Sequence, residues 1–291
     1  MNNVPKNSPR AWVLAARPKT LMGAAVPMML ALSLAASHGR GLSWVPAMLC
    51  VAFAMLMQID ANFVNDYFDG IRGNDAEGRL GPRRACAQGW VSLSAMRRAI
   101  ALTTILACLV GLPLVIYGGM AMIAVGAACV LFCFLYTTWL SYHALGDVLV
   151  LVFFGLVPVC LTYYLQQHSI GWQVVVVSLA CGIVIDTLLI INNYRDIDGD
   201  RSDGKLTLAV IIGPRATRHM YLATGWMATL MLVPVLQIWS PLMLPYLQMH
   251  TLTYREMCAI DHGKQLNKIL GKTSRNMFVF GLLASAGILL Q

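Results

Sequence analysis

The chain carries little charge for its length. Only 12% of its 291 residues are Asp, Glu, Lys or Arg, whereas 58% are hydrophobic and the mean hydropathy is +0.67. This composition argues against a soluble globular protein and favours a polytopic membrane protein. Apolar stretches of roughly 17 to 25 residues are long enough to cross a bilayer as helices. We therefore expect an all-α fold of about nine transmembrane helices, near residues 20–37, 43–64, 98–117, 119–139, 146–166, 171–192, 217–236, 238–251 and 276–290.

Other signals are missing as well. The eight cysteines show no CxxC or other metal-ligand spacing, so we interpret them as small core residues and not as disulfide partners or zinc ligands. The N-terminus lacks the short apolar stretch and cleavage site of a secretory signal, so the first helix should be retained. No Pro/Ser-rich linker divides the chain. We expect one domain, 1–291, with pseudo-repeat halves at about 20–139 and 146–290.

Basic residues gather on one side of the predicted topology. With nine spans, 20 of the 21 Lys and Arg fall on one face of the membrane, and only Arg40 falls on the other. Cytoplasmic loops of membrane proteins carry an excess of Lys and Arg. The bias predicts an integral protein of a bacterial inner membrane, with its N-terminus and active-site loops in the cytoplasm. It also explains the net charge of +8 without a nucleic-acid partner.

One short pattern, N-[DN]-Y-x-D, occurs twice. Its copies begin at Asn65 and Asn192, 127 residues apart, at the ends of the second and sixth predicted spans. A parallel repeat places equivalent motifs on the same face of the membrane, as the distribution of basic residues also requires. The repeat therefore indicates two related halves of one helical bundle that share a site.

Acidic residues are concentrated at the two motifs. Eight of the 13 acids lie in the stretches that begin with them. Residues four apart share a helix face, so Asn65 should face the same volume as Asp69, and Asp196 the same volume as Asp200. Carboxylates suit Mg2+, with Asp66 as a further candidate ligand, and nearby Arg and Lys would neutralise a diphosphate. The alternative for each stretch alone is a solvated loop that balances its own charge.

Two more acids are expected inside the membrane. Asp60 lies nine residues before Asp69, and Asp186 lies ten before Asp196, each within an apolar run. An ion at this depth is costly unless it faces a cavity or a partner. Each acid therefore either bonds to a neighbouring helix or lies near the acceptor end of the site, where one would act as a general base.

Weaker candidates line the same region. Tyr136 ends the fourth span and Asp147 opens the fifth, so both would line the same mouth, although anchoring at the membrane interface explains the tyrosine equally well. Asn62 is equally well explained as a hydrogen-bonding contact between helices. The candidate residues of an acceptor pocket are Asn62, Tyr67, Tyr136 and Asn192.

Four longer motifs, taken together, are more specific than a single DxxxD. They are Arg17-Pro18-Lys19-Thr20, Q-x3-N-x2-N-D-Y-x-D from Gln58 to Asp69, G-x-D-x3-R-x-G-P-x-R from Gly73 to Arg84, and N-N-x-R-D-I-x3-R-x2-G-K-x-T-L from Asn192 to Leu208. This series resembles the UbiA superfamily of intramembrane prenyltransferases. The most similar branch is the one that prenylates 1,4-dihydroxy-2-naphthoate.

The resemblance implies nine helices around a central cavity, with cytoplasmic loops as a cap and a lateral opening for a lipid tail. It implies Mg2+-dependent transfer of a polyprenyl group from polyprenyl diphosphate to 1,4-dihydroxy-2-naphthoate with decarboxylation, which gives demethylmenaquinol for menaquinone biosynthesis. Asn65, Asp69 and Asp75 match the first metal motif of the family, and Asp196 and Asp200 match the second. The basic residues at diphosphate-binding positions are Arg79, Arg83, Arg201, Lys205 and Lys19.

The sequence departs from the branch that prenylates 4-hydroxybenzoate. That branch commonly reads NDxxDxxxD, whereas here Gly73 stands eight residues after Asn65 and the next acid is Asp75. It also often carries a basic residue after the fourth span, whereas no Lys or Arg occurs between Arg98 and Arg195. Homogentisate, a haem or a chlorin are other possible acceptors, and the prenyl length and oligomeric state are open. A secondary transporter is a further alternative, but it would place its motifs near mid-span and not at helix ends.

Overall fold

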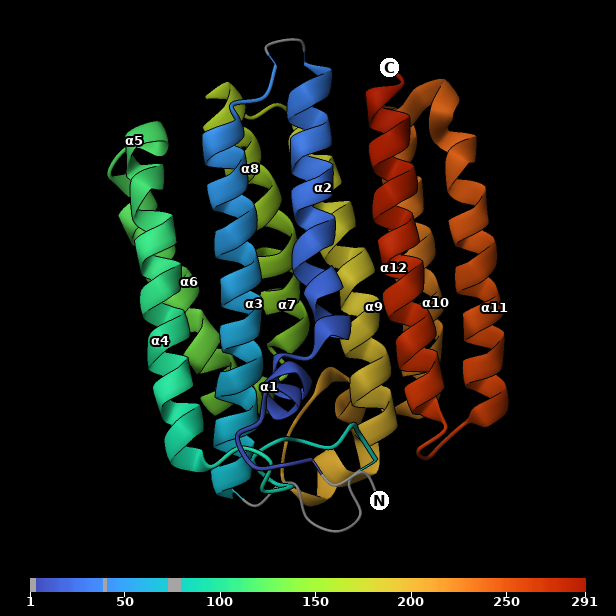
Figure 1. Ribbon diagram of the computed structural model, residues 1–291. Helices are drawn as coiled ribbons and strands as arrows, with labels where there is room; N and C mark the ends of the chain where they lie inside the picture. The colour runs from blue at the N-terminus through green and yellow to red at the C-terminus, as the bar shows by residue number, and fades with distance from the viewer. Residues whose placement is uncertain (1–3, 39–40, 73–79) are drawn as a thin grey trace.

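Long helices run side by side between the two ends of the molecule in the computed structural model, which describes residues 4–38, 41–72 and 80–291 (Figure 1). Within these residues the only strand-like pairing is a single bridge between His143 and Leu206. The expected all-α fold is confirmed. The helices are α1 (Pro9–Ala16), α2 (Met22–Ser37), α3 (Trp44–Arg72), α4 (Leu93–Gly111), α5 (Val115–Gly118), α6 (Ala121–Thr138), α7 (Gly146–Val150), α8 (Val157–Gln167), α9 (Trp172–Ser202), α10 (Leu208–Leu236), α11 (Leu244–Ile260) and α12 (Leu266–Leu289).

Seven helical segments of the described residues are long and apolar enough to cross a membrane. The last of them, Leu208–Ile260, comprises α10 and α11, which turn back on each other through a 3-10 segment at Gln237–Met243. Helix α12 is a further long helix that packs beside them (Figure 1). The number nine and the cytoplasmic cap loops stay predictions.

The outer surface is apolar. Ile116 and Ile238 expose 82% and 81% of their surface, and many other large aliphatic side chains are also exposed. Such a surface is stable where lipid, and not water, surrounds the helices. Trp44, Trp139 and Trp172 are also exposed and lie next to the ends of α3, α6 and α9, where membrane interfaces favour tryptophan.

Two helices extend further than their hydropathy predicted. The apolar runs were expected to end at residues 64 and 192, but α3 continues to Arg72 and α9 to Ser202. A helix satisfies its own backbone hydrogen bonds in lipid and in water alike, so hydropathy marks the edge of the apolar environment and not the end of the helix. Only residues 203–207 connect α9 to α10, and residues 261–265 connect α11 to α12.

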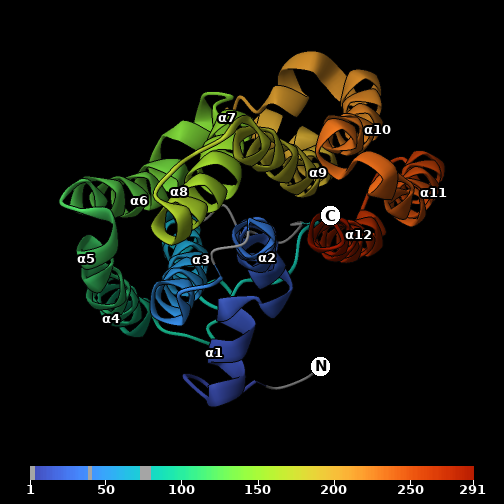
Figure 2. The ribbon, with the colours of Figure 1, turned by 90° about the horizontal axis from the view of Figure 1, so that it is seen from above.

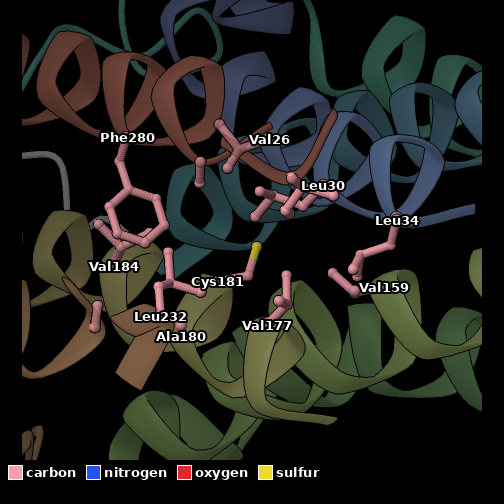
Figure 3. Close-up of a cluster of buried hydrophobic side chains, with 14 of the residues drawn as sticks. Val26, Leu30, Leu34, Val159, Val177, Ala180, Cys181, Val184, Leu232 and Phe280 are labelled. Atoms are coloured by element: carbon pink, nitrogen blue, oxygen red, sulfur yellow. The ribbon is translucent and has the colours of Figure 1, made fainter. Parts of the chain in front are cut away.

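The main core lies where α2, α8, α9, α10 and α12 meet, which Figure 3 shows in part. Viewed from above, α4 to α6 lie to one side of this core and α11 to the other (Figure 2). Helix α2 packs directly against α12, so the beginning and the end of the chain share one core. The labelled core residues are Val26, Leu30, Leu34, Val159, Val177, Ala180, Cys181, Val184, Leu232 and Phe280.

Glycines set the closest helix crossing. Between α7 and α8 the span contains a π-helical turn at Leu151–Leu156, which packs on α9. A Cβ atom on Gly182 would lie 2.9 Å from the Cα atom of Leu151, and one on Gly155 would lie 2.8 Å from the Cα atom of Gly182. Backbone-to-backbone approach of this kind is a common way to pack membrane helices, because lipid supplies no hydrophobic driving force between them. This close packing fixes α7 and the π-helical turn that follows it against α9.

Candidate functional site

The two N-[DN]-Y-x-D motifs lie at the same end of the bundle, because both α3 and α9 end there (Figure 1). The motifs occupy the last turns of these helices and not the loops that follow. The i, i+4 geometry predicted for Asn65 with Asp69 and for Asp196 with Asp200 is therefore present in α3 and α9. A helix end fixes the direction of such side chains more firmly than a loop does.

The first motif is held by Arg84. Its guanidinium forms an ion pair with Asp69, and both side chains are largely buried, at 8% and 15% exposed. Nη1 of Arg84 also donates to the backbone oxygen of Asn65 at 2.7 Å and to its side-chain Oδ1 at 3.1 Å. The neighbouring Arg83, which the sequence indicated as a diphosphate ligand, is exposed. Arg84, and not Arg83, is therefore the arginine that contacts the first motif.

Asp66 has a different environment from Asp69. Its Oδ2 accepts a hydrogen bond from the backbone N–H of Ala85 at 2.9 Å, and its Oδ1 accepts one from the N–H of Cys86 at 3.0 Å. The residue is 1% exposed. Both oxygens thus hold the segment that carries Arg84 against α3. Binding of a metal ion by Asp66 would compete with these two hydrogen bonds, so Asp66 is not among the proposed metal ligands.

The second motif carries its own arginine. Nε and Nη2 of Arg195 donate to the two carboxylate oxygens of Asp196 at 2.8 and 2.5 Å. The same guanidinium donates to Oδ1 of Asn192 at 2.8 Å and to Oδ1 of Asn267 at 2.9 Å. Nδ2 of Asn267 in turn donates to the backbone oxygen of Leu80 at 2.7 Å. One buried arginine thereby ties the second motif to α12 and to the segment that leads to Arg84.

Asp200 keeps one oxygen unused. Nζ of Lys205 lies 3.4 Å from its Oδ1, whereas its buried Oδ2 has no hydrogen-bond partner among the described residues. Burying an unpaired carboxylate oxygen is costly, so the arrangement points to a cation or a donor that binds there. Arg201 lies 3.9 Å from Asp198, and both side chains are exposed.

Asn62 holds the motif Arg17-Pro18-Lys19-Thr20 in place beside the site. Its Nδ2 donates to the backbone oxygen of Ala16 at 2.9 Å and to Oγ1 of Thr20 at 2.8 Å. The Ser274 hydroxyl donates to the backbone oxygen of Lys19, and the Lys19 side chain is exposed. Asn62 therefore holds the chain around Lys19 in place, which matches the interhelical alternative for this residue.

The two intramembrane acids differ from each other. Asp60 is fully buried and accepts hydrogen bonds from the hydroxyls of Thr103 and Thr104 on α4, the second at 2.8 Å. Asp186 is 7% exposed, and its Oδ1 has no partner among the described residues. Asp60 thus bonds a neighbouring helix, whereas Asp186 has unused capacity to accept a hydrogen bond.

Arg72 contributes in a way that the sequence did not reveal. Its guanidinium donates to the backbone oxygens of Thr137 and Thr138 at 3.1 and 2.9 Å, and it donates to the Tyr142 hydroxyl at 3.0 Å. The two backbone oxygens belong to the C-terminal turn of α6, where carbonyls have no hydrogen-bond partner within the helix. The arginine from α3 thereby fixes the end of α6 that carries Tyr136. The sequence after the fourth predicted span has no basic residue, and the cation that lies there is Arg72 from α3.

Other predicted residues have peripheral positions or lie outside the described part. Tyr67 is half-buried and packs edge-on against Phe68. Asp75 and Arg79 lie outside the described residues. Arg84 and Arg195 belong to the basic residues that the motifs carry, but the sequence did not single them out from their neighbours. Arg72 and Asn267 were not predicted, and no periodicity distinguishes them from neighbouring polar residues.

The carboxylates of the two motifs are suited to a hydrated Mg2+ and not to a closed protein cage. Within the described residues, no three His, Cys, Asp or Glu side chains converge as a preformed metal site. Mg2+ usually takes one or two carboxylates and completes its shell with water and phosphate oxygens. The unused Oδ2 of Asp200 and the partly exposed carboxylate of Asp196 fit such a shared role.

Comparison with known proteins agrees with the fold and the motifs. The profile of the UbiA prenyltransferase family matches residues 24–259. The 1,4-dihydroxy-2-naphthoate octaprenyltransferase of Escherichia coli (strain K12) is 34% identical over 240 residues, which cover 79% of this chain and 77% of that protein. The protein of the same name from Mycobacterium tuberculosis is 34% identical over 285 residues, which cover 96% of each chain.

Solved structures show the same architecture. A UbiA homolog from Aeropyrum pernix K1 superposes with a TM-score of 0.68 at 15% identity, over 92% of this chain and 97% of that one. A UbiA homolog from Archaeoglobus fulgidus, described as bound to DMAPP and Mg2+, superposes with a TM-score of 0.62 at 13% identity, over 94% and 99%. At such low identity these structures establish the fold alone. With the family profile and the relatives, they show that the chain is an integral membrane protein and belongs to the UbiA prenyltransferase family.

Proposed function

We propose that the protein transfers a polyprenyl group from an allylic polyprenyl diphosphate to 1,4-dihydroxy-2-naphthoate, with loss of CO2, and so forms demethylmenaquinol for menaquinone biosynthesis. The relatives with this substrate in their names support the choice of acceptor. The observation that carries the proposal is the pairing of Asp69 with Arg84 and of Asp196 with Arg195 at one end of the bundle. Paired charges of both signs are what a magnesium diphosphate requires.

When the diphosphate binds, the acids of the two motifs would give up their arginine partners for Mg2+, and the arginines would turn to the phosphate oxygens. Asp69, Asp196 and Asp200, with Asn65, would hold Mg2+, which supplies charge neutralisation for the leaving diphosphate when it is bound. Arg84 and Arg195 then have donors to turn towards phosphate oxygens, and guanidinium groups bind phosphate through paired hydrogen bonds. Lys205 would add a further cation beside Asp200, from which its Nζ lies 3.4 Å away.

The bond changes balance without an added oxidant. The C1–O bond of the prenyl diphosphate breaks, and its electron pair leaves with the diphosphate. The ring carbon that bears the carboxylate forms the new C–C bond to C1, and the carboxylate then leaves that carbon as CO2 while its C–C electron pair returns to the ring. The apolar helices exclude water from the allylic cation, which prevents its hydrolysis.

We further propose a single catalytic domain made of two pseudo-repeat halves, in a bacterial inner membrane with the motifs on the cytoplasmic side. The excess of Lys and Arg on the side of the predicted topology that carries the motifs supports this orientation. Cysteine accessibility at Cys86, near the motifs, would test it. A membrane-impermeant thiol reagent should reach Cys86 only in inverted vesicles.

Product analysis tests the acceptor and the site together. Purified protein receives Mg2+, a series of prenyl diphosphates, and naphthoate, 4-hydroxybenzoate or homogentisate, and mass spectrometry identifies each product. We expect decarboxylated prenyl naphthoquinol. Asp69→Ala and Asp196→Ala should each lower kcat by about 100-fold or more, whereas Asp198→Ala, on an exposed side chain of the same helix, should not. Product from another acceptor alone would refute the naphthoate assignment, and full activity of both variants would refute the metal assignment.

A further inference from the structure

A small pocket lies beside the second motif, between the end of α6, the start of α7 and the last turns of α9. Its lining includes Tyr136, Asp147, Asn193 and Lys205. Two backbone hydrogen bonds join the segments that close it: the N–H of Ala144 donates to the oxygen of Leu206 at 2.7 Å, and the N–H of Leu206 donates to the oxygen of Tyr142 at 3.2 Å. The pocket is therefore a built feature and not a gap between loops.

One face of α9 connects this pocket to the metal motif. Asp186, Asn193 and Asp200 are spaced seven residues apart and so lie on one face of the helix, about 10 Å from each to the next. Leu189, one turn after Asp186, also lines the pocket. Asp186 thus lies at the membrane side of the pocket, and Asp200 lies at its motif side.

Asp186 has no partner for a buried oxygen. The residue is 7% exposed, and its Oδ1 has no hydrogen-bond partner among the described residues. Asp60, at the corresponding depth in α3, has two threonine donors. A carboxylate oxygen buried without a donor costs free energy, which a bound ligand with a hydroxyl group would recover.

Asp147 and Tyr136 line this pocket together with Leu189, which lies one helical turn after Asp186. A Cβ atom on Gly146, the residue before Asp147, would lie 3.3 Å from Cδ2 of Leu189 and 4.0 Å from the Tyr136 hydroxyl. Helices α6, α7 and α9 therefore meet at the pocket, with Asp147 in its wall and Asp186 on the face of α9 that the pocket follows.

We propose that Asp147 and Asp186 form the site that binds the ring hydroxyl groups of the aromatic acceptor. This inference rests on the proposed prenyl transfer and names the residues that hold its acceptor. A phenolic O–H donates to a carboxyl oxygen, and Oδ1 of Asp186 is a buried oxygen that lacks a donor among the described residues. The hydroxyl keeps its proton in the balanced reaction, because CO2 and not a proton leaves the ring.

The same pair also selects the orientation of the acceptor. Two carboxyl groups offer the acceptor carboxylate no cation, so it faces away from them, and the hydroxyl faces them. Lys205 is the cation in the lining of the pocket and suits that carboxylate. The ring is thereby presented with its reacting carbon towards the metal motif.

Kinetics of Asp147→Asn and Asp186→Asn test the proposal. Asparagine keeps the volume but replaces one carboxyl oxygen, which can accept a hydrogen bond, by an NH2 group, which only donates, so the KM for the acceptor should rise about 10- to 100-fold while the KM for prenyl diphosphate stays within about twofold. An unchanged prenyl diphosphate KM also shows that the variant is folded. Asp198→Asn, a matched change at an exposed position of α9, should leave both constants unchanged. If Asp186→Asn does not fold, the half-buried Asp147 provides the test alone.

Methylated acceptors separate this inference from the proposed function. The wild type should prefer the free dihydroxy acceptor over its mono-O-methyl ethers by about 10-fold or more, and Asp147→Asn should lose that preference. Equal preference in wild type and variant, or a normal acceptor KM in both variants, would overturn the inference while prenyl transfer stands. If the wild type prenylates a different phenol, naphthoate is refuted, and the same comparison is made with that phenol and its methyl ether.

Discussion

The sharpest prediction concerns Asp66, because a metal ligand and a structural acceptor respond differently to Asp66→Asn. In the structure the carboxylate accepts two backbone hydrogen bonds, at 2.9 and 3.0 Å, and is 1% exposed. Hydrogen bonds to a charged group contribute about 1.5–3 kcal/mol each, and the amide oxygen of asparagine retains one neutral bond of about 1 kcal/mol. The change should therefore destabilise the segment at Ala85 and Cys86 by about 2–5 kcal/mol.

The consequence is measurable at Cys86 itself. A loss of this size favours local opening about 30-fold or more, so peptide-resolved thiol labelling of Cys86 should accelerate, whereas labelling of the half-buried Cys258 near the end of α11 should not change. Activity should fall because Arg84 is no longer held beside Asp69, and the Mg2+ concentration for half-maximal rate should stay the same. A higher Mg2+ requirement with unchanged Cys86 labelling would refute the reasoning and identify Asp66 as a ligand.

Two further variants test the packing around the site. Gly182→Ala places a Cβ 2.9 Å from the Leu151 backbone and should lower stability by about 1–3 kcal/mol in thermal unfolding; Gly199→Ala on the same helix meets nothing within 4 Å and should not, so equal effects would contradict the close-crossing account. Arg72→Gln removes donors to Thr137, Thr138 and Tyr142 and should lower kcat with little change in prenyl diphosphate KM; wild-type kcat would show that the end of α6 needs no such support.

Asp60 and Asp186 show the limit of sequence reasoning for buried acids. Both are single acids inside apolar runs at similar distances from the two motifs, so the sequence predicts the same role for both. Tertiary packing brings the hydroxyls of Thr103 and Thr104 to Asp60 and no donor to Oδ1 of Asp186. Hydrogen-bond partners on another helix have no fixed spacing in sequence, and this is why the two roles separate only in three dimensions.

The arginines show the same limit at short range. Arg83 and Arg84 are adjacent, both are basic, and only one of them faces the first motif. The outcome depends on how Asp66 anchors the N–H groups of Ala85 and Cys86, which turns Arg84 towards Asp69. Such a turn is set by two hydrogen bonds between the Asp66 side chain and a distant backbone segment, which local sequence pattern does not encode.

The sequence by itself determined the membrane class, the all-α fold and the two acidic motifs at helix ends, because hydropathy and charge are properties of residues that act wherever the chain meets lipid or water. Tertiary structure decided which residues meet: Arg84 with Asp69, Asn267 with Arg195, and Arg72 with the end of α6. These contacts join segments that lie far apart in the chain or on different helices. Their geometry follows from how the helices pack, and packing depends on the whole set of side chains and not on any one motif.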